Sequence, residues 1–249
     1  TVVAFRQILS RLFPFDERGL VHAYWAPNAW SLYSGADLVL ARSLRRRVGA
    51  SLTSGRVELD AQRMAVLPDV RPLHCAVLTL LAMLPPVYRI CKSGAQTHVQ
   101  RAYLLTRSVA HASLAAFWFG WHVHEKAILV TLIPLTLVAF QSKTAQRQWL
   151  LLLAAAQSSL LPLLLPAEPN TRFLAIVGSL LFFIVATRVS LKFGASSSRD
   201  VVFGYSFVVL VLLPCYSELI HPYVLDRTNR LPFVPLLLTS LLCAFGIGI

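Results

Sequence analysis

The residues best suited to chemistry lie in one short segment, Phe119 to Leu129, with the sequence FGWHVHEKAIL. Ionisable side chains at the junction of two apolar stretches are costly in a membrane and usually mark a functional site. Lys126, with an imidazole from His122 or His124, could hold the phosphate of a lipid-linked sugar as it leaves, because preorganised cations stabilise developing negative charge. Glu125 could fix Lys126 or the imidazole tautomer. The alternative is an ordinary polar turn with interfacial anchors.

Metal binding is not expected from these residues. His122 and His124 are two positions apart, a spacing that on a helix directs them to nearly opposite sides, and the segment is not an HExxH motif. The cysteines lie far apart, form no CxxC pair and are expected as free thiols, at positions Cys75, Cys91, Cys215 and Cys243. We therefore expect neither a metal nor another cofactor.

A second polar segment, Arg11 to Trp30, has the sequence RLFPFDERGLVHAYWAPNAW. Its prolines and glycine interrupt regular structure, and its aromatic residues are typical of a loop at the level of the lipid headgroups. The segment offers a guanidinium, an imidazole, an amide and sugar-stacking rings, from Arg18, His22, Tyr24, Trp25 and Asn28. The alternative reading of each residue is an interfacial anchor.

The elements that position these residues begin with a helix. Asn28 is expected to cap a helix from Ala29 to Leu44, which ends in Arg45, Arg46 and Arg47. Its expected apolar stripe consists of Trp30, Leu32, Tyr33, Ala36, Leu40 and Leu44. Residues 48–72 are expected as an exposed loop. Residues 1–72 are thus predicted to form a luminal or interfacial loop region with one amphipathic helix.

The remainder, residues 73–249, is predicted to be transmembrane. Hydrophobic residues make up 56% of the chain, charged residues 14%, and the mean hydropathy is +0.64, beyond what a soluble domain of this length carries. About seven apolar stretches could span a bilayer: Leu73–Ile90, Tyr103–Trp121, Ala127–Phe140, Trp149–Leu165, Phe173–Val189, Val201–Leu219 and Leu231–Ile249. The predicted fold is an all-α polytopic transmembrane helical bundle.

The net charge of +12 is interpreted as membrane-flanking charge. No basic surface interleaved with aromatics and no RNA-binding motif accompanies it, so a nucleic-acid partner is not expected, whereas membrane lipid is. Short connections on one side carry more Lys and Arg, which places that side in the cytosol. The segments Arg11–Trp30 and Phe119–Leu129 then share the opposite, luminal face. The basic run Arg42 to Arg47 departs from this pattern.

Both polar segments resemble the dolichyl-phosphate-glucose-dependent glucosyltransferases of the endoplasmic reticulum, whose members carry an RLFPF-x-RGL loop and a VHEK turn. HAYWAPN (His22 to Asn28) and FGWHVHEKAIL look like the member that adds the second glucose to the lipid-linked oligosaccharide. LTSG (Leu52 to Gly55), the VLP before Asp69 and PFVPLLLTS (Pro232 to Ser240) also match. The resemblance covers nearly the whole chain.

This resemblance implies a GT-C glycosyltransferase of the endoplasmic-reticulum membrane, multi-pass, metal-independent and inverting, with its active face in the lumen. Its partners would be dolichyl-phosphate-glucose as donor and a monoglucosylated, dolichyl-diphosphate-linked oligosaccharide as acceptor, joined through an α-1,3 linkage. It carries over His124, Glu125, Lys126, Arg18 and His22 as a donor-phosphate and sugar-contacting wall. The general base is implied in an earlier luminal loop, so we expect this chain to be an incomplete C-terminal portion, inactive alone.

Other functions compete with this one. Arg107, His111 and Arg188 lie within apolar stretches and could line the pathway of a transporter or channel. A non-catalytic membrane scaffold is a third reading. Within the resembling family, the transferase of the first glucose is the remaining alternative.

Overall fold

The computed structural model describes residues 7–8, 19–21, 25–45, 64–94, 97–164, 168–193, 199–225 and 233–248. Throughout these residues the regular elements are helices, as predicted, and no strand occurs among them. The longer helices are α2 (Ala29–Ser43), α4 (Pro72–Lys92), α5 (His98–Phe119), α6 (Ile128–Val138), α7 (Lys143–Leu160), α8 (Pro169–Lys192), α9 (Arg199–Phe207) and α11 (Val234–Gly248). Shorter 3-10 segments are η2 (Glu125–Ala127), η3 (Ala139–Gln141) and η4 (Leu161–Leu164).

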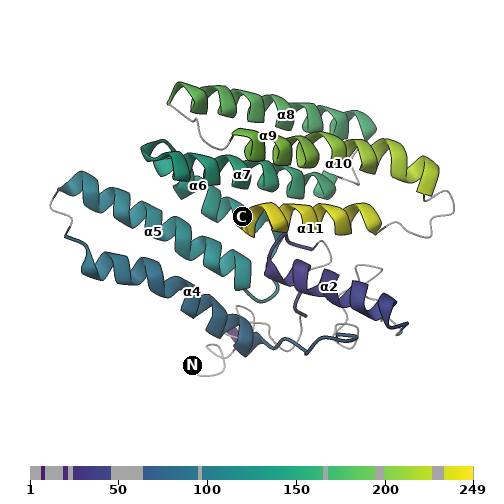
Figure 1. Ribbon diagram of the computed structural model, residues 1–249, viewed down its shortest axis with the longest axis horizontal. Coiled ribbons are helices and arrows are strands. Elements are labelled where there is room, and N and C mark those ends of the chain that lie inside the picture. Colours follow the sequence, from purple (N-terminus) through teal and green to yellow (C-terminus); the bar gives the residue numbers. More distant parts are fainter. Residues whose placement is uncertain are drawn as a thin grey trace.

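Helix α7 forms the centre of the bundle. It lies between α8 and α11 and also contacts α6 and α9 (Figure 1). Its residues from Trp149 to Ala156 are all buried. Two of its polar side chains bond the backbone of neighbours: the Gln146 amide donates to the Ser190 carbonyl at 2.9 Å, and the Ser158 hydroxyl donates to the Val209 carbonyl at 2.8 Å. Because lipid cannot satisfy backbone groups, such bonds fix the packing of membrane helices.

The helix after α9 is wound more loosely than an α-helix. The π-helical segments η5 (Val208–Leu212) and η6 (Tyr216–Leu225) flank the short α10 (Leu213–Cys215). Pro214 and Pro222 each lack a backbone N–H, which disrupts the usual bonding pattern and favours such bulges. The bond from Ser158 to the Val209 carbonyl stabilises this looser segment.

Within the described residues, three helices are long and apolar enough to cross a membrane by length and composition: Pro72–Lys92, Pro169–Lys192 and Asp200–Val224. Helix α11 is apolar but shorter. The outward sides of α4 and α8 expose large apolar residues, such as Leu80 at 65% and Phe173 at 65%. This surface suits lipid rather than water, and the protein is a membrane protein. Each of the seven predicted stretches is helical over most of its described residues, while seven spans remain a prediction.

The predicted start of helix α2 is confirmed, but the helix packs with a different face from the predicted apolar stripe. The Asn28 side chain accepts hydrogen bonds from the backbone N–H groups of Trp30 and Ser31, as an N-cap does. Of the predicted stripe, Trp30 is buried, whereas Leu40 and Leu44 are exposed at 39% and 57%. The buried face is instead made largely of small and polar residues, namely Trp30, Ser31, Ser34, Gly35, Asp37, Leu38 and Ala41.

Close approach of α2 to α11 explains this choice of face. The two helices are in contact, and a Cβ placed on Gly35 would lie 2.6 Å from a methyl group of Leu241. Small residues let helix backbones come together, and large apolar residues are then left for the outer surface.

Candidate functional site

The two polar segments singled out in the sequence are in direct contact. The backbone N–H of His122 donates to the carbonyl of Leu20 at 3.1 Å, and its ring Nδ1 lies 2.8 Å from the carbonyl of Gly19. A carbonyl oxygen only accepts, so Nδ1 carries the proton and Nε2 is the acceptor of the neutral ring. The turn between α5 and α6 is therefore held against the loop that precedes α2.

Two further bonds fasten the same junction from the side of α2. The Asn28 amide donates to the carbonyl of Phe117 at 3.4 Å, and the Trp30 indole donates to the carbonyl of Gly120 at 3.0 Å. Both acceptors belong to the last turn of α5 and its end, where carbonyls lack helical partners. The loop and α2 thus satisfy the carboxyl end of α5.

The turn contains a residue at positive φ and a glycine in tight surroundings. His122 has a φ of 51°, in the left-handed region that few side chains adopt. At Gly120 an added Cβ would lie 2.3 Å from the Ala116 carbonyl oxygen and 2.7 Å from a methyl group of Val123. A glycine is needed there because the chain turns back on the end of α5.

The two histidines lie in a turn rather than on a helix, so the helical spacing that would direct them to opposite sides does not apply. Their rings meet edge to face with centroids 5.8 Å apart. No group of three potential metal ligands occurs among the residues searched, which are the described ones.

Exposure separates the three residues of the HEK sequence. His124 and Lys126 are exposed, whereas Glu125 is 3% exposed and begins η2, which contacts α7. The Glu125 Oε2 atom is buried and has no hydrogen-bond partner in the part of the chain that the structure describes. Of the two roles predicted for Glu125, an ion pair with Lys126 is not formed among the described residues, and an effect on the imidazole tautomer remains a prediction. The arrangement presents an imidazole and an ammonium outward above a buried carboxylate.

Only some of the predicted site residues of the first loop are among the described residues. Arg18, His22 and Tyr24 lie outside the described residues. Trp25 and Asn28 are 3% and 2% exposed. Trp25 packs edge-on against Phe233 with ring centroids 5.6 Å apart, and Asn28 caps α2. Both side chains are therefore packed in the interior of the structure, and their sugar contacts remain a prediction.

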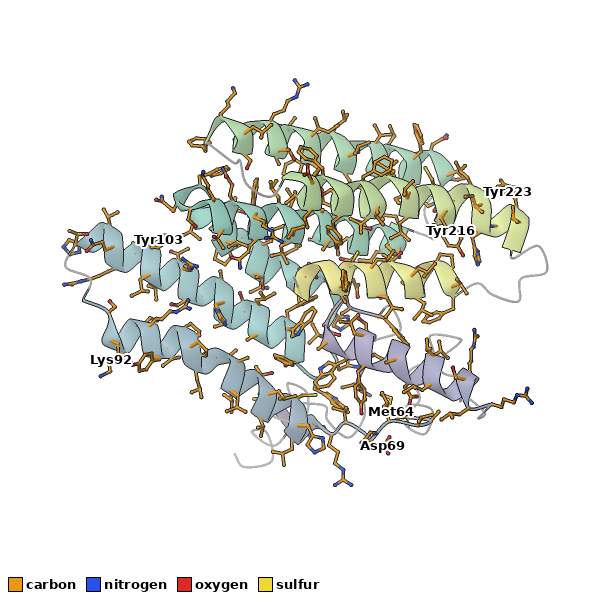
Figure 2. The ribbon with its side chains drawn as sticks, viewed as in Figure 1. Met64, Asp69, Lys92, Tyr103, Tyr216 and Tyr223 are labelled. Atoms are coloured by element: carbon orange, nitrogen blue, oxygen red, sulfur yellow. The ribbon has the colours of Figure 1, made fainter. Side chains whose placement is uncertain are left out.

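A buried carboxylate that the sequence reasoning missed pins the following loop. Asp37, fully buried on α2, accepts backbone hydrogen bonds from Ala65, Val66 and Leu67, each at 2.8 Å. Met64 and Asp69 lie beside α2 (Figure 2), where the Asp69 carboxylate accepts from the Met64 backbone at 2.9 Å. The available signal was an isolated acid in an otherwise uncharged stretch of helix. Burying a carboxylate costs free energy unless donors compensate it, so such a residue indicates hidden donors.

The same loop is anchored through a tyrosine. The Tyr33 hydroxyl donates to the Pro68 carbonyl at 2.8 Å. Burial and the nearby carboxylates of Asp37 and Asp69 raise the pKa of the Tyr33 phenol above its usual value. The phenol therefore remains a neutral donor near pH 7, and the last part of the predicted exposed loop is fixed to α2.

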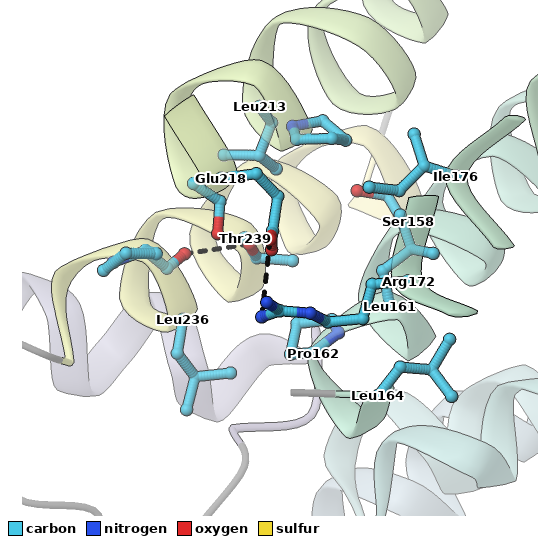
Figure 3. Close-up of a pocket in the computed structure, with 13 residues that line it drawn as sticks. Ser158, Leu161, Pro162, Leu164, Arg172, Ile176, Leu213, Glu218, Leu236 and Thr239 are labelled. Atoms are coloured by element: carbon cyan, nitrogen blue, oxygen red, sulfur yellow. Dashed lines mark hydrogen bonds and ion pairs between the residues drawn. The ribbon is translucent and has the colours of Figure 1, made fainter. Parts of the chain in front are cut away.

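A small polar pocket adjoins α11. Arg172 of α8 and Glu218 of η6 form an ion pair of 3.3 Å beside Thr239 (Figure 3). The next residue, Ser240, donates its hydroxyl to the carbonyl of Trp25 at 2.6 Å, which links α11 to the first loop. The pocket has a volume of only about 40 Å³, enough for a few water molecules but not for a sugar.

Comparison with known proteins places this geometry in a family context. The family model described as "ALG6, ALG8 glycosyltransferase family" matches residues 1–249. A Drosophila melanogaster protein named "Probable dolichyl pyrophosphate Glc1Man9GlcNAc2 alpha-1,3-glucosyltransferase" is 38% identical over 244 residues, which are 97% of this chain and 46% of that protein. The Bos taurus and Arabidopsis thaliana proteins with the same name, without "Probable", are 37% and 36% identical over 97% of this chain.

These alignments cover 46% of the Bos taurus protein and 49% of the Arabidopsis thaliana protein. The chain thus spans about half the length of the curated relatives that it matches. No solved structure matches it.

Proposed function

Since this chain belongs to the ALG6, ALG8 glycosyltransferase family, we propose that its protein transfers glucose from dolichyl-phosphate-glucose to an oligosaccharide carried on dolichyl diphosphate. The proposed product is an α-1,3 linkage, and the proposed acceptor already bears one glucose. The names of the relatives, which specify Glc1Man9GlcNAc2, support this acceptor over one without glucose. The proposed location is the endoplasmic-reticulum membrane, crossed several times, with the site on the luminal face.

The contact of His122 with Gly19 and Leu20 is the observation that carries the proposal. It makes one surface from two segments that lie about a hundred residues apart. On that surface the exposed Lys126 and His124 offer an ammonium and an imidazole to a leaving phosphate. Cations fixed in advance stabilise the charge that develops when the bond from glucose C1 to the phosphate oxygen breaks.

The reaction balances without a metal or redox step. The acceptor hydroxyl forms the new bond to C1, dolichyl phosphate leaves with the electron pair, and the hydroxyl proton passes to a base. We assign no residue of this chain as that base. The proposed role of Lys126 and His124 is to bind the donor phosphate, and that of Glu125 is to orient them through its negative charge.

The test is transfer by the full-length protein, purified and given labelled dolichyl-phosphate-glucose. Two acceptors should be compared: the dolichyl-diphosphate-linked glycan with one glucose and the same glycan with none. We expect label to enter the first acceptor and to be released by an enzyme specific for terminal α-1,3-glucose. Preferred labelling of the glucose-free acceptor would identify the first-glucose reaction. Absence of transfer with both acceptors would refute the proposal.

A further inference from the structure

A cavity of about 320 Å³ lies away from the turn between α5 and α6. Residues of α4, α5, α6, α7 and α11 line it. Its cationic residue on α5, Arg107, precedes Phe119 by more than three turns, which is about 18 Å along the helix axis. Lys92 and Tyr103 lie towards the ends of α4 and α5 that are far from this turn (Figure 2). The cavity is therefore separate from the surface proposed for glucose transfer.

Positive charge dominates the polar lining of this cavity. Arg89 and Arg107 both line it, His111 lies one turn beyond Arg107, and no Asp or Glu is among its lining residues. One nitrogen of Arg107 donates to the Tyr103 hydroxyl at 3.0 Å, which is a neutral partner. Among the described residues, the recorded ion pair belongs to Arg172 and Glu218, so neither arginine is neutralised by a described carboxylate. Arg107 is half-buried, and Arg89 is exposed in the last turn of α4. Two permanent charges that face one cavity repel each other unless an anion compensates them.

A buried hydroxyl on the α6 wall gives independent support for a ligand. Thr131 is 1% exposed and lines the cavity, and its Oγ1 atom has no hydrogen-bond partner among the described residues. Leaving a buried hydroxyl without a partner costs free energy. A ligand oxygen in the cavity would accept its hydrogen bond.

Apart from the Gln148 amide on α7, the rest of the lining is apolar. Leu114, Leu135 and Val138 come from α5 and α6, and Leu151, Leu152 and Ile247 come from α7 and α11. Cations and one hydroxyl together with aliphatic walls match a ligand that has an anionic head and an alkyl chain. Paired guanidinium groups suit phosphate oxygens, to which they donate several hydrogen bonds each.

We propose that this cavity binds the phosphate group of a membrane lipid, with Arg89, Arg107 and Thr131 on the phosphate oxygens and the aliphatic walls against the chain. The site is distinct from the proposed glycosyl-donor surface and has its own ligand. Binding is read directly, so its test does not depend on whether the protein transfers glucose.

Native mass spectrometry of the full-length protein in detergent tests the proposal. The probes are dioleoyl phosphatidic acid, dioleoylglycerol with the same chains but no phosphate, and inorganic phosphate. The variants are Thr131→Val and the double variant Arg89→Gln with Arg107→Gln. The matched control is Arg188→Gln, because Arg188 lies on the candidate span α8 and does not line this cavity.

We expect the double variant to bind phosphatidic acid about tenfold or more weakly than the wild type, because charge-assisted hydrogen bonds are lost. Thr131→Val should weaken it by a smaller factor, Arg188→Gln should not, and dioleoylglycerol should bind weakly to every form. Arg107→Lys keeps the charge but not the guanidinium fork, so its affinity for phosphatidic acid should lie between those of the wild type and the double variant. Equal melting temperatures of the variants would confirm that they are folded.

Three results would overturn the proposal. The first is equal binding of phosphatidic acid by the wild type and the double variant. The second is an equal loss in Arg188→Gln, which would indicate general attraction to charge. The third is inorganic phosphate binding as tightly as phosphatidic acid, which would indicate a site for the free anion.

Discussion

The ring Nδ1 of His122 and the carbonyl oxygen of Gly19 lie 2.8 Å apart, although 103 residues separate them in the sequence. This hydrogen bond joins the turn after α5 to the loop before α2, and the backbone bond from His122 to Leu20 runs beside it. His122, whose backbone is left-handed, thus supplies both bonds from the turn to Gly19 and Leu20.

Substitution of His122 should test this junction. We expect His122→Val to lower the free energy of unfolding by about 2 to 3 kcal/mol, since it loses a hydrogen bond and places a β-branched residue at positive φ. His122→Asn should cost less, because asparagine tolerates this backbone and its amide can donate to the Gly19 carbonyl. Thermal unfolding in detergent measures both. Equal destabilisation by valine and asparagine would contradict the assigned bond.

Substitution of Lys126 should weaken binding of the donor rather than binding of the acceptor. We expect Lys126→Ala in the full-length protein to weaken use of dolichyl-phosphate-glucose by about tenfold to a hundredfold, as expected for a lost charge-assisted hydrogen bond. Lys126→Arg should retain part of the activity because the charge remains. Steady-state transfer at varied donor concentration measures the effect. The control is Lys143→Ala, an exposed lysine at the start of α7. Unchanged transfer by Lys126→Ala would remove its proposed role.

Glu125 is predicted to lower the stability of the protein while supporting glucose transfer. Its Oε2 atom is buried without a partner, and burying an unsatisfied carboxylate oxygen is unfavourable. We expect Glu125→Gln, which keeps the shape but removes the charge, to raise the melting temperature while lowering transfer. Thermal unfolding and the transfer assay on the same preparation measure both quantities. A lower melting temperature would show that the charged form is stabilising.

Asp37 should be among the most sensitive residues outside the proposed site. Its carboxylate accepts three backbone bonds, and Asp37→Asn turns one oxygen into a donor that faces N–H groups. We expect a loss of roughly 3 kcal/mol and faster proteolysis of the loop around Ala65. Asp69→Asn is the matched control, because Asp69 is exposed and accepts one recorded bond, from Met64. Similar effects of the two variants would contradict the role given to Asp37.

Gly120 should not tolerate a side chain. Its added Cβ would meet the Ala116 carbonyl oxygen at 2.3 Å, so the end of α5 must shift. We expect Gly120→Ala to destabilise the protein by about 2 to 4 kcal/mol, in the range of strained backbone sites. Gly94→Ala is the control, since nothing lies within 4 Å of its added Cβ. Melting temperatures compare the two, and a harmless Gly120→Ala would rule out the tight turn.

Local features of this protein could be predicted from its sequence because they depend on neighbouring residues. The apolar stretches indicated helices in a membrane, and Asn28 indicated the start of α2 through a bond that spans two residues. The quoted motifs also indicated the family, which the family model confirms over residues 1–249. The proximity of the two polar segments followed from the alternation of helices, which places successive connections on alternate ends.

The tertiary structure alone decided which side chains face one another. Trp25 was predicted to be available for a sugar, but the Ser240 hydroxyl holds its carbonyl across 215 residues, and the side chain is buried. The two imidazoles meet because their segment forms a turn rather than a helix. Asp37 received its three donors, and α2 its buried face, from segments distant in sequence. Residue types and periodicity specify which side chains need partners, whereas only the packing of distant segments supplies those partners.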